Sequence, residues 1–544
     1  MRRVIPSLFV LLTLSFSVAA QTYPVHLNSI GFLPELKKSA AIPHECESFK
    51  VVNAETAKEV FTGKSTGPKF QKDVDQNVWI ADFSEVKTPG KYYLEVPGLG
   101  KSTEFEIADD AFRFAAKTSM RAFYLWRCGM GVHGEYEGNV YETEACHLKD
   151  AYEDYIGKPG SQRNGTGGWH DAGDHGKYVV NAGVTLGVLF YAWDHFQVNL
   201  EKVEYELPET APGYPEFLKE LKWETDWILK MQYPDGSGRV SHKLTRTNFS
   251  GFIMPQDDHE KRYFTEWSSA ATADFVALMA MAARHFKSYD AEYAQKCLDA
   301  AWVSYRFLQE NPEYKRFEQG DFQTGGYQSR NVDDRLWAAA ELWETTGDPE
   351  CLADFEKRAA DMEFEIDENW DWSDVSNLGM FTYALSERSG KNPQVAQTIR
   401  KDILENAGDL VKKAQEDVYN RPLAGRYYWG CNGTVARQTV NLQVANKLQP
   451  DKKYIETALD AVNHIFGHNY YNRSYVTGLG LNPPMNPHDR RSGADDVEAP
   501  WPGYIVGGGH SATDWVDEEE SYSHNEVAIN WQAALVYALA GFVN

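Results

Sequence analysis

Apolar residues change their spacing once along this chain, near Asp109, and that change constrains the fold more than any other feature. Before it, apolar and polar side chains alternate, so that Tyr92, Leu94 and Val96 share one face of an extended segment, as in a half-buried strand. After it, apolar residues recur every three or four positions, as on one face of a helix. One such set is Ile455, Ala458, Leu459, Val462 and Phe466. The sequence therefore predicts a small all-β unit followed by a mainly helical one.

The two predicted units divide the chain of 544 residues unequally. Residues 22–107 contain short alternating runs separated by turn signals such as Pro89-Gly90 and Pro97-Gly98, a pattern that favours an immunoglobulin-like β-sandwich. Residues 110–544 form the predicted helical domain. Its helices are separated by long stretches rich in Gly, Pro, Asn and aromatic residues, and loops of such length usually carry function. Examples are 239–268, 421–436 and 477–525.

Residues 1–20 have the pattern of a removable secretory signal peptide. Arg2 and Arg3 supply the positive end, Val4–Val18 is mostly apolar, and small residues precede the expected cut before Gln21. The alternative is a membrane anchor, but the apolar run is short for a span and polar sequence follows it. We therefore expect an exported protein, secreted or periplasmic, with no membrane span in the mature chain.

The net charge of -25 argues against nucleic acid or an anionic membrane as a partner, because both would be repelled. A neutral or cationic ligand is favoured. Aromatic residues make up 13% of the chain, which suits a cleft that stacks against flat ligand faces. The sequence leaves the oligomeric state unknown.

The segment Gly167–Lys177 places two carboxylates, Asp171 and Asp174, three positions apart among glycines. Two acids held close on an irregular backbone suit work on a bound water, because a carboxylate can orient the water and accept its proton. A calcium loop and a solvated turn are the alternatives, since Asp and Gly are also common in ordinary turns.

Four separated motifs, in one order along the chain, together resemble those of glycoside hydrolase family 9, the cellulase family. They are Gly-Gly-Trp-His-Asp-Ala-Gly-Asp at 167–174, the segment 467–478, Asn-Pro-His-Asp-Arg-Arg-Ser at 486–492, and Ser521–Asn530 with its Asn-Glu-Val-Ala block. Residues 28–34 and 82–84 are similar to the immunoglobulin-like module that precedes many members. The resemblance implies an (α/α)6 barrel catalytic domain behind that sandwich, and hydrolysis of β-1,4-glucan with inversion of configuration.

The resemblance also implies roles for three acids. An inverting glycosidase needs one carboxylate that activates water and one carboxylic acid that protonates the leaving oxygen. By motif match, Asp174 is the expected base, Asp171 a second ligand of the water, and Glu526 the expected acid. The alternative for Glu526 is a charge that only favours the start of the last helix.

Four further residues are expected to contact sugar. In the family, His488 and Arg490 would donate hydrogen bonds to sugar hydroxyls, although both could be ordinary loop ion-pair partners. Asp489 departs from the family pattern, where a second histidine is usual, and this leaves the details of the subsites open. Trp429 lies on a segment similar to a substrate loop, and Tyr522 is close enough to Glu526 to line its pocket.

Cys128, Cys146, His147 and His170 form a possible metal site. Two thiolates and two imidazoles make a closed tetrahedral zinc site of the structural kind. The alternative is a disulfide between Cys128 and Cys146, which an oxidising compartment would favour. The pattern resembles the zinc site of family members that carry the N-terminal immunoglobulin-like module, so we expect Zn²⁺. Family members commonly also bind Ca²⁺, for which the sequence assigns no ligands.

The leading interpretation is an endo-acting β-1,4-glucanase whose substrate is a β-glucan polysaccharide or oligosaccharide. An exo-acting member of the same family, such as a cellodextrinase or a glucosaminidase, is the main alternative. An inactive carbohydrate-binding protein is less consistent with three intact acids. A metal hydrolase is excluded, because four protein ligands leave zinc no open position for water.

Overall fold

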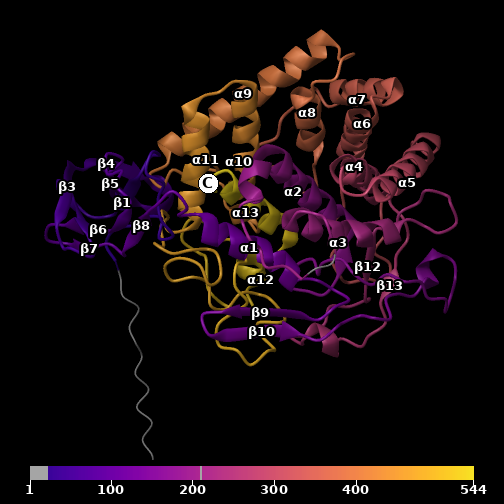
Figure 1. Cartoon of the computed structure of the whole chain (residues 1–544), viewed down its shortest axis with the longest axis horizontal. Coiled ribbons are helices and arrows are strands. Elements are labelled where there is room, and N and C mark those ends of the chain that lie inside the picture. Colours follow the sequence, from indigo (N-terminus) through magenta and orange to yellow (C-terminus); the bar gives the residue numbers. More distant parts are fainter. Residues whose placement is uncertain (1–22, 209–210) are drawn as a thin grey trace, which may run out of the picture.

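The computed structural model describes residues 23–208 and 211–544 (Figure 1). The predicted signal peptide at 1–20 lies outside the described residues. A small β unit lies at one side of a much larger helical body, and the chain enters that body at α1 (Arg113–Leu125).

The β unit is a sandwich of two antiparallel sheets. One sheet has the order β1 (Ser39–Ile42), β5 (Gln76–Asp82), β4 (Thr66–Gln71); the other has the order β3 (Glu59–Lys64), β2 (Ser48–Asn53), β6 (Gly90–Val96), β7 (Gly100–Lys101), with β8 (Phe105–Ile107) also paired to β6. Inward residues of both sheets form one core, in which Phe32, Phe83 and Phe105 pack with ring centroids 5.2–5.3 Å apart. Tyr92, Leu94 and Val96 are buried as predicted, but Tyr93 between them is buried as well, so the alternation is not strict.

Twelve helices of the described chain form the (α/α)6 barrel that the sequence predicts. The inner ring is α2 (Val179–Leu200), α4 (Ser269–Phe286), α6 (Val332–Thr346), α8 (Ser376–Leu385), α10 (Cys431–Leu448) and α13 (Ile529–Ala540), and each contacts the next until α13 closes on α2. The outer layer is α1, α3 (Glu216–Met231), α5 (Ala291–Glu310), α7 (Pro349–Asp361), α9 (Pro393–Glu416) and α11 (Lys452–Ile465).

The two layers differ in how much of each helix is buried. Every residue of α13 is buried, whereas α9 buries only a stripe from Ile399 to Ala414. An inner helix is covered on all sides, so its sequence shows little periodicity. This explains one wrong boundary. The predicted loop 421–436 includes the first turns of α10, because the buried polar run Cys431-Asn432-Gly433-Thr434 has no helical pattern.

Short elements connect the helices. They are the hairpin β9 (Val132–Tyr136) and β10 (Asn139–Thr143), the sheet β11 (Lys177–Tyr178), β12 (Lys243–Thr245) and β13 (Tyr263–Phe264), the 3-10 turns η1 (Lys72–Val74), η2 (Asp154–Ile156) and η3 (Pro255–Asp257), and α12 (Tyr522–Asn525). No helix among the described residues is long and apolar enough to cross a membrane.

The sandwich is attached to the barrel by polar and apolar contacts. Asn28 Nδ2 donates to Asn463 Oδ1 at 2.9 Å, and Lys37 Nζ lies 3.0 Å from Asp460 Oδ2. Beside them, a small apolar cluster joins the strands to the barrel; it contains Ala41, Val78, Val418 and Tyr419. The two units therefore pack as one body in the region near α11.

Candidate active site

A cavity of about 370 Å³ opens at the N-terminal ends of the inner helices. Most of its side chains come from segments that lead into those helices, while Asn530 and Trp531 lie in the first turn of α13. Its lining includes Asp171, Asp174, Tyr178, Phe249, Tyr327, Asp371, Trp372, Trp429, Glu526, Asn530 and Trp531. Backbone N–H groups at helix N-termini carry partial positive charge, which favours acidic side chains there.

Backbone pairing brings the distant acids to one place. Ala172 forms an antiparallel bridge with Ala528, and the Ile529 amide donates to the Asp171 carbonyl at 2.9 Å. Gly173 lies against the His488 segment so closely that a Cβ there would stand 2.2 Å from the His488 carbonyl oxygen. The glycine is therefore required for the close approach of the two segments.

Asp171 and Asp174 are both buried and are held by different donors. Asp171 accepts from Asn181 Nδ2 at 2.8 Å and from the Tyr327 hydroxyl. Asp174 Oδ2 accepts from the Tyr178 hydroxyl at 2.9 Å and from the Gly176 amide at 3.0 Å. Burial and the neighbouring charge of Asp174 raise the pKa of Asp171 well above its usual range. The two acids are thus close enough to interact and fixed in orientation.

Glu526 faces the same cavity from the segment before α13. Removal from water raises the pKa of its carboxyl well above the usual range, and the charges of Asp174 and Asp171 add to the effect. A carboxyl group in this state keeps its proton to a higher pH than an ordinary glutamate and can donate it. The structure therefore places an acid with a raised pKa in the same cavity as the pair Asp171 and Asp174.

Tyr178 and Tyr327 are functional candidates that the sequence reasoning missed. Their rings pack against each other with centroids 4.9 Å apart, and each hydroxyl donates to one of the two acids. Burial raises the pKa of both phenols well above the usual range, so both remain donors. No local signal marks Tyr327, which reaches Asp171 only through the fold.

Replacing Tyr327 with phenylalanine tests this support. The change removes one hydrogen bond to an acid without opening a cavity, and such bonds contribute about 1.5–3 kcal/mol. We expect kcat on a soluble β-glucan to fall about 10-fold. Tyr289→Phe, a half-exposed tyrosine after α4, is the matched control. Unchanged kcat in Tyr327→Phe would mean that the hydroxyl does not orient Asp171.

The His488 backbone pairs with that of Glu526 and the Arg490 charge acts on the Glu526 carboxyl, but neither side chain is among those that line the cavity. His488 Nδ1 lies 2.7 Å from the Glu519 carbonyl, and Arg490 donates from Nε to the Ser250 carbonyl at 3.1 Å. Asp489 is 2% exposed and binds Arg491 through both carboxylate oxygens, at 3.0 and 2.7 Å. The departure from the family pattern is therefore a buried ion pair outside the cavity lining.

Trp429 lines the cavity, whereas Tyr522, which was expected to line the pocket of Glu526, packs beside Trp429 and is not among the lining residues. Their ring centroids are 5.5 Å apart, and Tyr522 also contacts the His488 ring at 6.0 Å. They are 46% and 53% exposed, unusual values for side chains of this size. Phe249, which is also exposed and lies under the Arg490 guanidinium, lines another part of the cavity. These rings offer flat apolar faces next to the acids.

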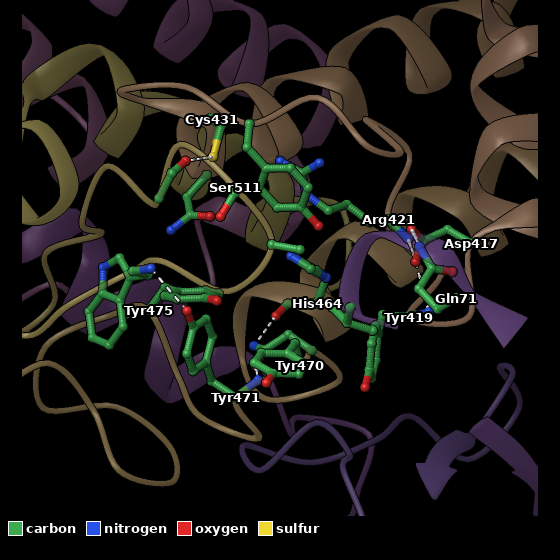
Figure 2. Close-up of a pocket in the computed structure, with 17 residues that line it drawn as sticks. Gln71, Asp417, Tyr419, Arg421, Cys431, His464, Tyr470, Tyr471, Tyr475 and Ser511 are labelled. Atoms are coloured by element: carbon green, nitrogen blue, oxygen red, sulfur yellow. Dashed lines mark hydrogen bonds between the residues drawn. The ribbon is translucent and has the colours of Figure 1, made fainter. Parts of the chain in front are cut away.

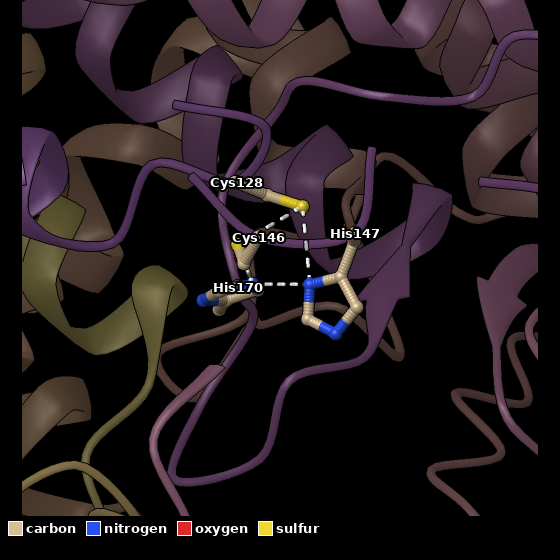
Figure 3. Close-up of side chains that lie close together, drawn as sticks. All are labelled: Cys128, Cys146, His147 and His170. Atoms are coloured by element: carbon tan, nitrogen blue, oxygen red, sulfur yellow. Dashed lines mark hydrogen bonds between the residues drawn. The ribbon is translucent and has the colours of Figure 1, made fainter. Parts of the chain in front are cut away.

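The four predicted metal ligands also converge (Figure 3). Cys128 Sγ and Cys146 Sγ are 3.9 Å apart and are not joined by a disulfide. Sulfur-to-nitrogen distances are 3.6 Å from Cys128 to His147 Nδ1 and 3.7 Å from Cys146 to His170 Nε2, and the two nitrogens are 3.4 Å apart. Around a tetrahedral zinc with ordinary bond lengths, two sulfur ligands lie about 3.8 Å apart, a sulfur and a nitrogen about 3.6 Å, and two nitrogens about 3.3 Å. The donor set and its geometry fit zinc.

A second cavity lies between the sandwich and the barrel, lined by Arg421, His464 and several tyrosines (Figure 2). Its volume is about 20 Å³, enough for a water molecule but not for a sugar ring. It is therefore not a competing substrate site.

Two family profiles match the chain. The profile described as Glycosyl hydrolase family 9 matches residues 112–539, and the one described as Cellulase N-terminal ig-like domain matches residues 20–101. The front sandwich is thus the immunoglobulin-like domain that the sequence predicts.

Known relatives agree with the profiles. The chain is 56% identical over 522 residues to Endoglucanase D of Acetivibrio thermocellus, covering 96% of this chain and 83% of that protein. It is 32% identical to the Cellodextrinase of Butyrivibrio fibrisolvens, with 95% and 99% covered. The crystal structure of the Zn-binding triple mutant of family 9 endoglucanase J30 matches with a TM-score of 0.88 at 31% identity, covering 94% of this chain and 100% of that one. The chain is therefore a glycosidase that belongs to glycosyl hydrolase family 9.

Proposed function

We propose that this protein is an endo-β-1,4-glucanase that cleaves cellulose or a related β-glucan with inversion of configuration. One observation carries the proposal: Glu526, whose pKa is raised, lines the same aromatic-lined cavity as the paired acids Asp171 and Asp174. That arrangement supplies both the acid and the base that inversion needs. The relatives named endoglucanases support the choice of substrate.

In the proposed reaction, Asp174 accepts a proton from a water molecule that Asp171 helps to orient. The water attacks the anomeric carbon from one face of the sugar ring, while Glu526 protonates the departing glycosidic oxygen on the other. Tyr178 and Tyr327 keep the two aspartates in place through their hydroxyl groups. The exocyclic bond breaks as the new carbon–oxygen bond forms, so the released end has the opposite anomeric configuration.

Exposed aromatic and polar side chains near the acids are the proposed contacts to the substrate. Trp429 and Tyr522 present exposed rings, which suit stacking against the apolar face of a pyranose. Arg490 can donate hydrogen bonds to sugar hydroxyls, whereas neutral His488, whose Nδ1 donates to the Glu519 carbonyl, can accept one from a hydroxyl at Nε2. No charged ligand is needed, in agreement with the strongly acidic chain.

Product profiling tests the proposed function. We expect a fast fall in the viscosity of a long soluble β-1,4-glucan, with products of several lengths and the α-anomer formed first, as seen by NMR. Parallel assays on mixed-linkage glucan, xyloglucan, xylan and chitosan oligomers define the substrate range. Release of only one- or two-sugar units from an end would favour the exo-acting cellodextrinase or glucosaminidase alternative, and no turnover on any of them would favour a carbohydrate-binding protein.

Zinc is proposed as a structural ion held by Cys128, Cys146, His147 and His170. When bound, it would tie the segment of Cys146 to His170, which directly precedes Asp171 in the chain. We expect one zinc per chain by elemental analysis. Its removal by a chelator is expected to expose two reactive thiols and to lower Tm by about 5 °C or more. A metal-free protein with a 128–146 disulfide would contradict the zinc site.

Calcium and export remain predictions. Both groups of possible metal ligands found among the described residues contain histidine, whereas calcium prefers oxygen ligands. Calcium-dependent stability in a chelator titration would test the first prediction. A mature N-terminus at Gln21, found by sequencing the protein from periplasm or medium, would support the second.

A further inference from the structure

A second group of polar side chains converges directly beside the proposed zinc ligands. Its members are His147, His175 and Asp258, whose ligand atoms lie within 4.8 Å of one another. His147 belongs to both groups: its Nδ1 faces Cys128 Sγ at 3.6 Å, and its Nε2 faces Asp258 Oδ2 at 3.7 Å. In Figure 3 this second ring nitrogen points away from the two sulfurs.

These groups are buried, and several of their atoms have no hydrogen-bond partner. The unpartnered atoms include His147 Nε2, His175 Nδ1 and Asp258 Oδ2, and His175 Nδ1 is 3.8 Å from that same oxygen. Leaving buried polar atoms unpaired costs about 1–3 kcal/mol each. A shift of about half an ångström in each contact would let one carboxylate oxygen accept from both rings. The other oxygen, Oδ1, already accepts from Arg246 Nη1 at 2.7 Å.

The ring nitrogen of His147 that carries the proton determines which nitrogen can bind a metal. A neutral imidazole carries a single N–H, and a carboxylate can only accept. If His147 donates from Nε2 to Asp258, its Nδ1 has a free lone pair on the side of the cysteines, where a metal ligand needs it. Metal-binding histidines commonly donate their other N–H to a carboxylate in this way.

We propose that Asp258 is a positioning residue that orients the zinc ligand His147 and, through His175, the catalytic loop. His175 directly follows Asp174 in the chain, and its carbonyl accepts from Arg262 Nη1 at 2.7 Å. One buried carboxylate therefore joins the metal cluster to the loop of the proposed base. The inference rests on the zinc site and the glycosidase mechanism proposed above.

A second metal ion held by His147, His175 and Asp258 is the alternative, and two observations disfavour it. The guanidinium groups of Arg246 and Arg262 act on Asp258 from close by, so a further dication would be repelled. His147 would also have to lose both ring protons to bind two metals at once. A carboxylate that accepts two N–H groups satisfies the same atoms without either cost.

The test replaces Asp258 with asparagine, which keeps the size of the side chain and removes its charge. We expect zinc affinity, measured by competition with a chromogenic chelator, to fall by about 10- to 100-fold. Asp257→Asn, at the exposed neighbouring position, is the matched control and is expected to bind zinc normally. Should Asp258→Asn not fold, Asp258→Glu keeps the charge but displaces it, and it must weaken zinc binding in the same direction.

Activity gives a second, independent readout. At limiting zinc, Asp258→Asn is expected to lose kcat, and saturating zinc is expected to restore most of it, which a general packing defect would not show. Normal zinc affinity in Asp258→Asn, or two zinc ions in the wild type and one in the variant, would overturn the inference. A wild type that cleaves glucan but binds no zinc would overturn the zinc site and this inference while leaving the proposed catalysis intact.

Discussion

Replacing Glu526 with glutamine is expected to lower kcat on an unactivated β-1,4-glucan by about 10³-fold or more, because the amide cannot protonate the leaving oxygen. The effect should depend on the leaving group. A dinitrophenyl β-cellobioside releases a stable anion without a proton, so the same variant is expected to lose less than about 10-fold on it. Steady-state kinetics on the two substrates measure the difference.

The pH dependence of activity is a second test of Glu526 as the general acid. A general acid works only while protonated, and burial raises the pKa of Glu526. Wild-type activity is therefore retained past the usual glutamate range and is lost as the pH rises through that raised pKa. On the dinitrophenyl β-cellobioside, the activity of Glu526→Gln is expected not to show this fall at high pH, the alkaline limb of the profile. Equal losses on both substrates, with the limb unchanged, would mean that Glu526 is not the acid.

The second large effect is expected at Asp174. Asp174→Ala removes the group that takes the proton from water, so kcat is expected to fall by about 10³-fold or more. Sodium azide should restore part of the turnover, because azide attacks without needing a base. The expected product is a glycosyl azide of inverted configuration, identifiable by NMR.

Two controls make the Asp174 result specific. Asp361→Ala removes an exposed acid at the end of α7 and is expected to be as active as the wild type. Glu526→Gln still contains the base, so azide is expected to give it no such rescue on glucan. Near-normal turnover in Asp174→Ala without azide would show that another group activates the water.

The periodicity of apolar residues was sufficient to predict the two units and several helices. Ile455 to Phe466 falls within and just after α11, and Tyr92 to Val96 lies on β6. The start of α10 was predicted wrongly because a helix buried on all sides, with polar residues at its N-terminus, has no amphipathic pattern. Residue types alone could not reveal this, since buried Asn432 finds its partner in a distant segment, where its amide donates to the Gly507 carbonyl.

The candidate acids came from motif resemblance and not from spacing. The fold explains why they belong together: the bridge between Ala172 and Ala528 joins the loop of Asp171 to the segment of Glu526. Tyr327 and Asp258 carry no motif in the sequence, and their roles follow from which acid or histidine they reach. The interpretation of Asp489 also changed, from an altered subsite to a buried partner of Arg491.

By itself, the sequence determined the order of the two units, the family resemblance, the three acids and the four possible zinc ligands. Only the tertiary structure decided that Glu526 lies where its pKa rises, that Tyr178 and Tyr327 donate to the aspartates, and that Asp258 lies between His147 and His175. The physical reason is that periodicity and motifs report local conformation. Desolvation, hydrogen-bond pairing and the field of neighbouring charges arise only when distant segments are packed together.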